Sequence, residues 1–234
     1  MQVSGLLCNY TRESSCQLHV SYLAKVTRSR HNTGHMKTLL IATQNRHKTV
    51  EIAQLLATMA VRVVTLADVA PDLDIPETGE TFAANAREKA LAAACATGLT
   101  ALADDSGLAV DTLQGQPGVY SRRFAPTDQE RILKLLNLLA GVPWPRRTAR
   151  FHCAVAIADP QGILTEFEET VLGHLTETAR GDQGFGYDPI FQADGETRTM
   201  AEMTLTEKNA ISHRGKAFRR AAAWVREHEA QLTA

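Results

Sequence analysis

The spacing of apolar positions changes along the chain. Short continuous apolar runs alternate with segments in which apolar residues recur at helical spacing. Apolar runs at 38–42 and 61–66 have the length of buried strands, and a helical period over 47–59 separates them. A second helical period begins at about residue 81 and is rich in alanine, which favours close packing against a sheet. Alternating strands and helices of this kind are typical of α/β proteins.

The second half of the chain predicts a helix, a hairpin and a final helix. Residues 127–130 have the spacing of a capping box and open a leucine-rich helical period. Residues 151–157 alternate as on a strand, and a turn at 159–162 leads into a second strand at 163–172. Ser212 is placed to cap the last helix. We therefore expect an α/β body with a second lobe and a small-molecule site in the cleft between the lobes.

A polar interruption divides the apolar stretch at 102–110. Residues 104–107 are two aspartates, a serine and a glycine, and we interpret them as a turn between two buried strands. Because neighbouring side chains on a strand point to opposite faces, Asp104 and Asp105 are expected to have different roles. Two such acids could hold Mg²⁺, or one could take a proton from water. The alternative is a turn whose side chains cap their own backbone.

The segment 43–48 forms a polar turn between the first strand and its helix. Such a turn places backbone N–H groups and the positive end of the helix side by side, which favours phosphate, and Lys48 adds a mobile charge. The turn lacks the glycines and the ending of a Walker loop. In the alternative interpretation, Thr43 or Asn45 merely caps the helix.

Two further polar clusters lie toward the end of the chain. Residues 184–191 set aromatic rings among glycines in a loop, where a ring could stack on a planar base or pack back into the core. In the second cluster, 208–216, His213 and Arg214 stand at a helix start, where cations are normally disfavoured. That position is easier to understand if they face an anion or a base that carries a keto group.

The alanine-rich helix carries two polar residues near its start. Asn85 and Lys89 are four positions apart and therefore share one face of the helix. We interpret them as solvated, because asparagine and lysine side chains are mostly exposed.

Composition and charge narrow the class of protein. The chain has 234 residues, 44% hydrophobic and 22% charged, with a net charge of −1, so no field favours a nucleic acid polymer or an anionic membrane. Its apolar runs are too short to span a bilayer. The four cysteines form no CxxC pair, which favours a reduced, intracellular and cytoplasmic protein.

The first residues differ in composition from the rest. Residues 1–35 are rich in Ser, Thr, Asn, Arg and His and contain a single acid, Glu13. We expect a disordered extension there, followed by a single two-lobed domain over 36–234 that starts near Met36.

Several motifs occur in an order that resembles one known family. They are Thr43-x-Asn45-x-x-Lys48, Glu77-Thr78-Gly79-x-Thr81-Phe82-x-x-Asn85-Ala86, Asp104-Asp105-Ser106-Gly107-Leu108, Pro117-Gly118-Val119-Tyr120-Ser121, Gly184-Phe185-Gly186-Tyr187-Asp188-Pro189-Ile190-Phe191 and Ser212-His213-Arg214-Gly215. Together they resemble the inosine triphosphate pyrophosphatase family, whose members hydrolyse ITP, dITP and XTP. The resemblance implies an elongated mixed β-sheet with flanking helices that form two lobes around a central cleft, a Mg²⁺ cofactor and a homodimer. One departure is Arg122-Arg123, where members usually have Ala-Arg.

The same resemblance implies a role for each matched residue. Asp105 would be the catalytic proton acceptor and a metal ligand, with Glu77 as a further metal ligand. The triphosphate would be bound by Thr43, Gln44, Asn45, Arg46, His47, Lys48, Ser106 and Lys208. The base would stack on Phe185, in a pocket shaped by Gly186, Tyr187 and Asp188, and its 6-keto edge would be read by His213 and Arg214.

The reaction implied is attack of water on the α-phosphorus of a nonstandard purine nucleotide, which releases pyrophosphate and the monophosphate. Two alternatives stay open from the sequence. One is a pyrophosphatase of related fold that acts on pyrimidine or modified nucleotides. The other is a nucleotide-binding module that does not hydrolyse its ligand.

Overall fold

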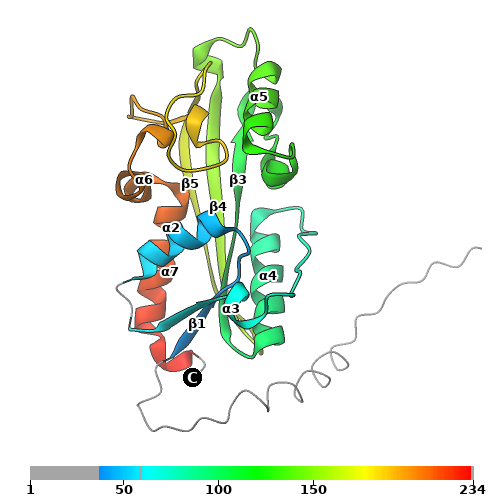
Figure 1. Ribbon diagram of the computed structural model, residues 1–234, viewed down its shortest axis with the longest axis vertical. Coiled ribbons are helices and arrows are strands. Elements are labelled where there is room, and N and C mark those ends of the chain that lie inside the picture. Colours follow the sequence, from blue (N-terminus) through cyan, green and yellow to red (C-terminus); the bar gives the residue numbers. More distant parts are fainter. Residues whose placement is uncertain (1–36, 58–59, 233–234) are drawn as a thin grey trace, which may run out of the picture. The chain divides into compact units, whose positions relative to one another are not determined.

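The structure, a computed structural model, describes residues 37–57 and 60–232; the extension expected over 1–35 lies outside the described residues. A six-stranded sheet has the strand order β2-β1-β3-β4-β5-β6 (Figure 1). Its strands are β1 (Thr38–Ile41), β2 (Arg62–Thr65), β3 (Thr100–Val110), β4 (Thr148–Asp159), β5 (Gly162–Leu175) and β6 (Phe191–Ala193). The helices are α2 (Arg46–Leu56), α3 (Leu66–Val69), α4 (Phe82–Thr97), α5 (Asp128–Leu138), α6 (Leu205–Ile211) and α7 (His213–Glu227). Within the described residues, no helix has both the length and the apolarity needed to cross a membrane.

The sheet is mixed, as the sequence predicts. β1 pairs in parallel with both β2 and β3, which is the expected result of two strand–helix–strand connections. The later pairs, β3 with β4, β4 with β5 and β5 with β6, are antiparallel. The predicted hairpin is therefore confirmed as β4–β5, and the predicted helices are confirmed as α2, α4, α5 and α7.

Helices cover both faces of the sheet. In Figure 1, α2 and α7 lie on one side of the strands and α4 lies on the other. Ala86, Ala90, Ala93 and Ala94 of α4 are buried against the sheet, so that the small side chains allow a close approach. On the opposite face, Phe218 of α7 belongs to a separate cluster with the helix α2.

A third apolar cluster forms the second lobe. It unites Leu108 and Val110, at the end of β3, with Leu135 of α5 and Phe191 of β6. The predicted capping box of α5 is present, with Thr127 as its first residue. The first residues of β3 thus pack in the two cores on the faces of the sheet, and its last residues pack in the third core. The polar positions 104–107 lie between these two parts of the strand.

The turn predicted at 104–107 is wrong, because β3 runs through it without a break. Residues 101–110 all pair with β4 in one register. Gly107 serves close packing here: an added Cβ would lie 2.6 Å from the carbonyl oxygen of Gly118 and would also clash with Ser121 Oγ. The backbone at Gly118 therefore packs closely against β3 at the position where the sequence indicated a turn.

Candidate active site

The cleft opens where β1 ends. β1 pairs with β3 only as far as Leu102, and no described strand continues along that edge of β3. A cavity of about 680 Å³ lies there, a size suited to a small-molecule ligand. Because the edge is free, side chains from both faces of β3 meet at this place.

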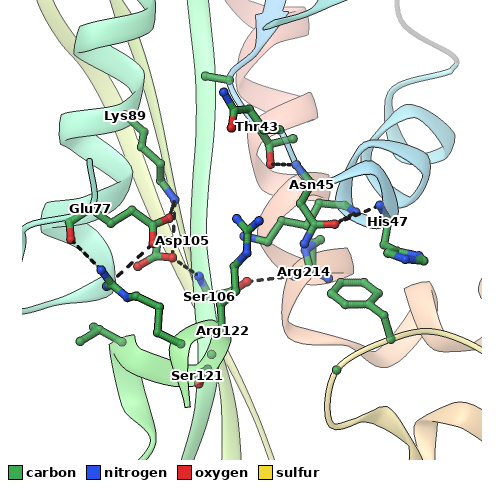
Figure 2. Close-up of a pocket in the computed structure, with 18 of the residues that line it drawn as sticks. Thr43, Asn45, His47, Glu77, Lys89, Asp105, Ser106, Ser121, Arg122 and Arg214 are labelled. Atoms are coloured by element: carbon green, nitrogen blue, oxygen red, sulfur yellow. Dashed lines mark hydrogen bonds and ion pairs between the residues drawn. The ribbon is translucent and has the colours of Figure 1, made fainter. Parts of the chain in front are cut away.

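The predicted site residues come together around this cleft. Those that line it are Thr43, Gln44, Asn45, His47, Lys48, Glu77, Asp105, Ser106, Phe185, Gly186, Tyr187, Asp188, Lys208, His213 and Arg214, several of which are labelled in Figure 2. The side chain of Arg46 lies outside the described part of the chain. Segments more than a hundred residues apart thus share one cavity.

Asp105 lies on the face of β3 that packs against α4. Its Oδ2 accepts a hydrogen bond of 2.9 Å from Asn85, and Lys89 Nζ lies 3.5 Å from its Oδ1. Lys89 also donates to Glu77 Oε1 at 2.8 Å, so one ammonium joins the two carboxylates (Figure 2). Burial raises the pKa of Asp105, and the charge of Lys89 offsets only part of that rise. Asp105 therefore takes up a proton more readily than an exposed aspartate.

The interpretation of Asn85 and Lys89 as solvated residues is wrong. Both are buried, because they lie on the same face of α4 as the alanines that pack on the sheet. Asn85 Oδ1 in addition accepts a hydrogen bond from the backbone of Gly79, which fixes the loop before the helix. Their spacing relative to Ala86 and Ala90 was the signal that could have indicated burial.

Asp104 points to the other face of β3 and is enclosed by cations. Lys48 Nζ lies 2.8 Å from its Oδ2, and Arg214 Nε lies 3.7 Å away. Ser106 Oγ donates to the same oxygen and accepts from Arg214 Nη2 at 2.9 Å. Although burial opposes ionisation, Lys48 and Arg214 hold the pKa of Asp104 well below its usual value. The charged carboxylate fixes both cations at the cleft.

Glu51, which the sequence analysis missed, lies one turn after Lys48 on α2. Lys208 Nζ lies 2.6 Å from both Glu51 Oε1 and Asp188 Oδ2, and Arg214 donates to Glu51 Oε2. Burial would raise the pKa of Glu51, but the charges of Arg214 and Lys208 outweigh it and lower that pKa. A lone glutamate in a polar helix gives no sequence signal of such a role beyond its spacing of three from Lys48.

The loop before β6 divides its aromatic rings between core and cleft. Tyr187 is buried, and its hydroxyl donates to the carbonyl oxygen of Ser121 at 3.0 Å. Phe185 stays at the cleft, where its ring stacks on His47 with a centroid distance of 5.3 Å. Asp188 fixes the loop by accepting from the backbone of Phe185 at 2.8 Å. Packing into the core, one of the two alternatives derived from the sequence, thus holds for Tyr187, and stacking of Phe185 on a base stays a prediction.

His213 lies at the start of α7 with its ring stacked on Phe151, 4.6 Å between centroids. Burial, followed by the charges of Arg214 and Lys208, lowers the pKa of His213 well below 6.5. The imidazole is therefore neutral near pH 7. Ser212 caps this helix, as predicted, by accepting from the backbone of Gly215.

Glu77 and Asp105 are the residues that could hold a metal ion. Among the described residues, no group of three or more His, Cys, Asp or Glu side chains forms a closed metal site. Mg²⁺ prefers oxygen ligands and commonly takes only one or two carboxylates, with water and substrate phosphates completing its shell. The carboxylates of Asp105 and Glu77 both contact Lys89 and lie beside a cleft lined with cations. They fit a site in which protein carboxylates and substrate phosphates would hold the ion together.

A mixed α/β fold whose cleft gathers carboxylates and cations from distant segments belongs to the class of proteins with a built site for a charged small molecule. A sequence model of the Ham1 family matches residues 39–224, and the chain belongs to this family. The resemblance drawn from the motifs is thereby confirmed.

Relatives and solved structures agree with this assignment. A dITP/XTP pyrophosphatase of Desulforamulus reducens is 48% identical over 174 residues, which are 73% of this chain and 87% of that protein. Another, of Deinococcus deserti, is 52% identical over 171 residues, 72% of this chain and 79% of that protein. A solved HAM1 protein from Coxiella burnetii superposes with a TM-score of 0.73 at 40% identity, covering 82% of this chain and 100% of that one. The mixed α/β fold expected from the sequence is confirmed.

Proposed function

We propose that the protein is a nucleoside triphosphate pyrophosphatase that hydrolyses dITP, ITP and XTP to the monophosphate and pyrophosphate. Membership of the Ham1 family and similarity to proteins named dITP/XTP pyrophosphatase support this activity. The observation that carries the proposal is that Asp104 and Asp105 have different surroundings on the two faces of β3. Asp104 is fixed among cations on one face, and Asp105, with a raised pKa, faces the cleft from the other.

In the proposed reaction, a water molecule attacks the α-phosphorus of the bound nucleotide. Its proton passes to Asp105, and the bond from the α-phosphorus to the bridging oxygen of pyrophosphate breaks. Asp105 lines the cleft, where its carboxylate can accept this proton, and general-base catalysis of this kind contributes roughly 10²–10⁴-fold. Lys48, at the start of α2, lies on the side of the cleft where its charge would orient the phosphates.

Asp105 and Glu77 are the proposed ligands of Mg²⁺. When bound, Mg²⁺ would neutralise charge on the phosphate oxygens and orient them. Lys89 lies within 3.5 Å of Asp105 and 2.8 Å of Glu77, so it holds the two carboxylates in one position in the absence of a ligand.

Selection of the base would rest on the side of the cleft near α7. Phe185 would stack on the base, and His213 and Arg214 would face its 6-keto oxygen. A neutral imidazole donates one hydrogen bond and arginine donates several. The 6-amino group of adenine would leave such a donor unpaired, at a cost of roughly 1–3 kcal/mol.

A panel of nucleoside triphosphates, assayed for pyrophosphate release with Mg²⁺, tests the proposal. We expect ITP, dITP and XTP to be hydrolysed at least about tenfold faster than ATP, dTTP or UTP, in terms of kcat/KM. A preference for dTTP or UTP would instead favour the alternative of a pyrimidine or modified-nucleotide pyrophosphatase. Tight binding of ITP without release of pyrophosphate would favour the non-hydrolysing module.

The proposal includes a homodimer that acts in the cytoplasm on free nucleotides, and no nucleic acid polymer or membrane as a partner. Light scattering coupled to gel filtration measures the mass of the assembly. A mass of one chain at assay concentration would contradict the homodimer and leave the proposed activity unaffected.

A further inference from the structure

The lysines and arginines that line the cleft differ in what they contact. Six of the seven lie close to a carboxylate of the protein: Lys48, Lys89, Arg123, Arg131, Lys208 and Arg214. The seventh, Arg122, is exposed and makes no hydrogen bond or ion pair with any residue that the structure describes. Its positive charge is therefore available to a ligand of the cleft.

Local geometry gives Arg122 and its neighbour different directions. Both belong to η2, a 3₁₀ helix over Gly118–Arg123, in which residues three apart lie on one side. Val119 and Arg122 both line the cleft. Arg123 also lines the cleft, but its guanidinium lies over the ring of Tyr120, 5.4 Å from its centroid, and donates to the backbone oxygen of Glu77 at 3.3 Å. The two adjacent arginines thus have separate roles.

The backbone that carries Arg122 is fixed against β3. Ser121 Oγ accepts from the backbone of Leu108 at 2.9 Å and donates to the carbonyl oxygen of Gly118 at 2.6 Å. The absence of a side chain at Gly107 allows this close contact. Arg122 accordingly extends from a rigid support beside Asp105 and Ser106 (Figure 2).

We propose that Arg122 binds the phosphate chain of the substrate. This inference rests on the proposed function and names a substrate-binding residue for it. A nucleoside triphosphate carries several negative charges, and a guanidinium binds phosphate oxygens through two parallel hydrogen bonds.

The substitution Arg122→Ala tests the proposal in two assays. We expect KM for ITP to rise about tenfold, the effect of one charge-assisted contact. The binding of inorganic tripolyphosphate, measured by calorimetry, should weaken by a similar factor, and competitive inhibition by inosine should not change. Arg122→Lys should retain part of the affinity, because it keeps the charge and loses the two-pronged geometry.

Arg226→Ala is the matched control, because it removes the same charge from an exposed position on α7 outside the cleft. If Arg122→Ala and Arg226→Ala bind ITP and tripolyphosphate equally well, the proposal is overturned. It is also overturned if Arg122→Ala weakens inosine as much as tripolyphosphate. Should the unsubstituted protein fail to hydrolyse ITP, the proposed function fails, and the tripolyphosphate measurement still decides whether Arg122 binds phosphate.

Discussion

Asp104 and Asp105 are adjacent residues whose side chains point to opposite faces of β3. Asp104 lies among Lys48 and Arg214, which lower its pKa, and burial raises the pKa of Asp105. The sequence predicted the opposite directions, because alternation along a strand is a local property. It could not predict the partners, which come from α2, α4 and α7 and meet only in the folded chain.

At Phe185, removal of the ring tests the proposed stacking on the base. Stacking contributes roughly 1–3 kcal/mol per base, so Phe185→Ala should raise KM for ITP about tenfold or more and change kcat less. Phe185→Tyr keeps the aromatic face and serves as the control. A tenfold loss confined to kcat, measured by steady-state kinetics, would contradict the stacking role.

Among the elements, α2 connects the two sides of the cationic cluster. Its Lys48 reaches Asp104, and its Glu51 joins Lys208 of α6 to Arg214 of α7. The helix therefore contacts both the residues proposed to bind phosphate and those proposed to face the base. Because Asp104, Glu51, Lys208 and Arg214 are buried and Lys48 is half-buried, the cluster depends on each charge having its partner.

Glu51→Gln should lower the free energy of unfolding by about 3 kcal/mol, since it leaves Lys208 and Arg214 short of a buried counter-charge. Urea unfolding followed by circular dichroism measures the change. Glu177→Gln, at an exposed position after β5, is the matched control and should cost less than about 0.5 kcal/mol. Equal stability of the two variants would show that the cluster is not needed for folding.

Elements with a strong local period were predictable from the sequence, and those set by distant contacts were not. The helix α5 begins at its predicted capping box, and the β4–β5 hairpin turns at its predicted residues. The turn at 104–107 was predicted wrongly, because Gly107 permits contact with η2 rather than a change of direction. The short helix α6 was missed, since it has only seven residues.

Across the described residues, apolar cores on the two faces of the sheet and in the second lobe meet at β3. The cleft lies at this junction, and buried ionisable groups surround it. The motifs located most of these groups from the sequence, because their order matched a family. The burial of Glu51, Asn85 and Lys89 depends on packing between lobes and helices. This packing cannot be predicted from a single motif.

His213 links this burial to the pH dependence of stability. Its folded-state pKa lies well below 6.5, so below pH 6.5 the unfolded chain binds a proton there that the folded chain does not. Stability should therefore fall as the pH drops below 6.5, by up to about 1.4 kcal/mol per pH unit from this residue. His213→Gln should reduce that slope in urea unfolding series between pH 7.5 and 5.5. An unchanged slope would contradict the burial of a neutral imidazole.

The most direct test of the proposed chemistry compares pyrophosphate release from ITP by the unsubstituted protein and by Asp105→Asn. Loss of the proton acceptor should lower kcat by roughly 10²–10⁴-fold. Asp72→Asn, an exposed loop residue outside the cleft, makes the same chemical change and should keep full activity. The Asp105→Asn variant should be folded and nearly inactive; equal rates from Asp105→Asn and the unsubstituted protein would show that Asp105 is not the proton acceptor.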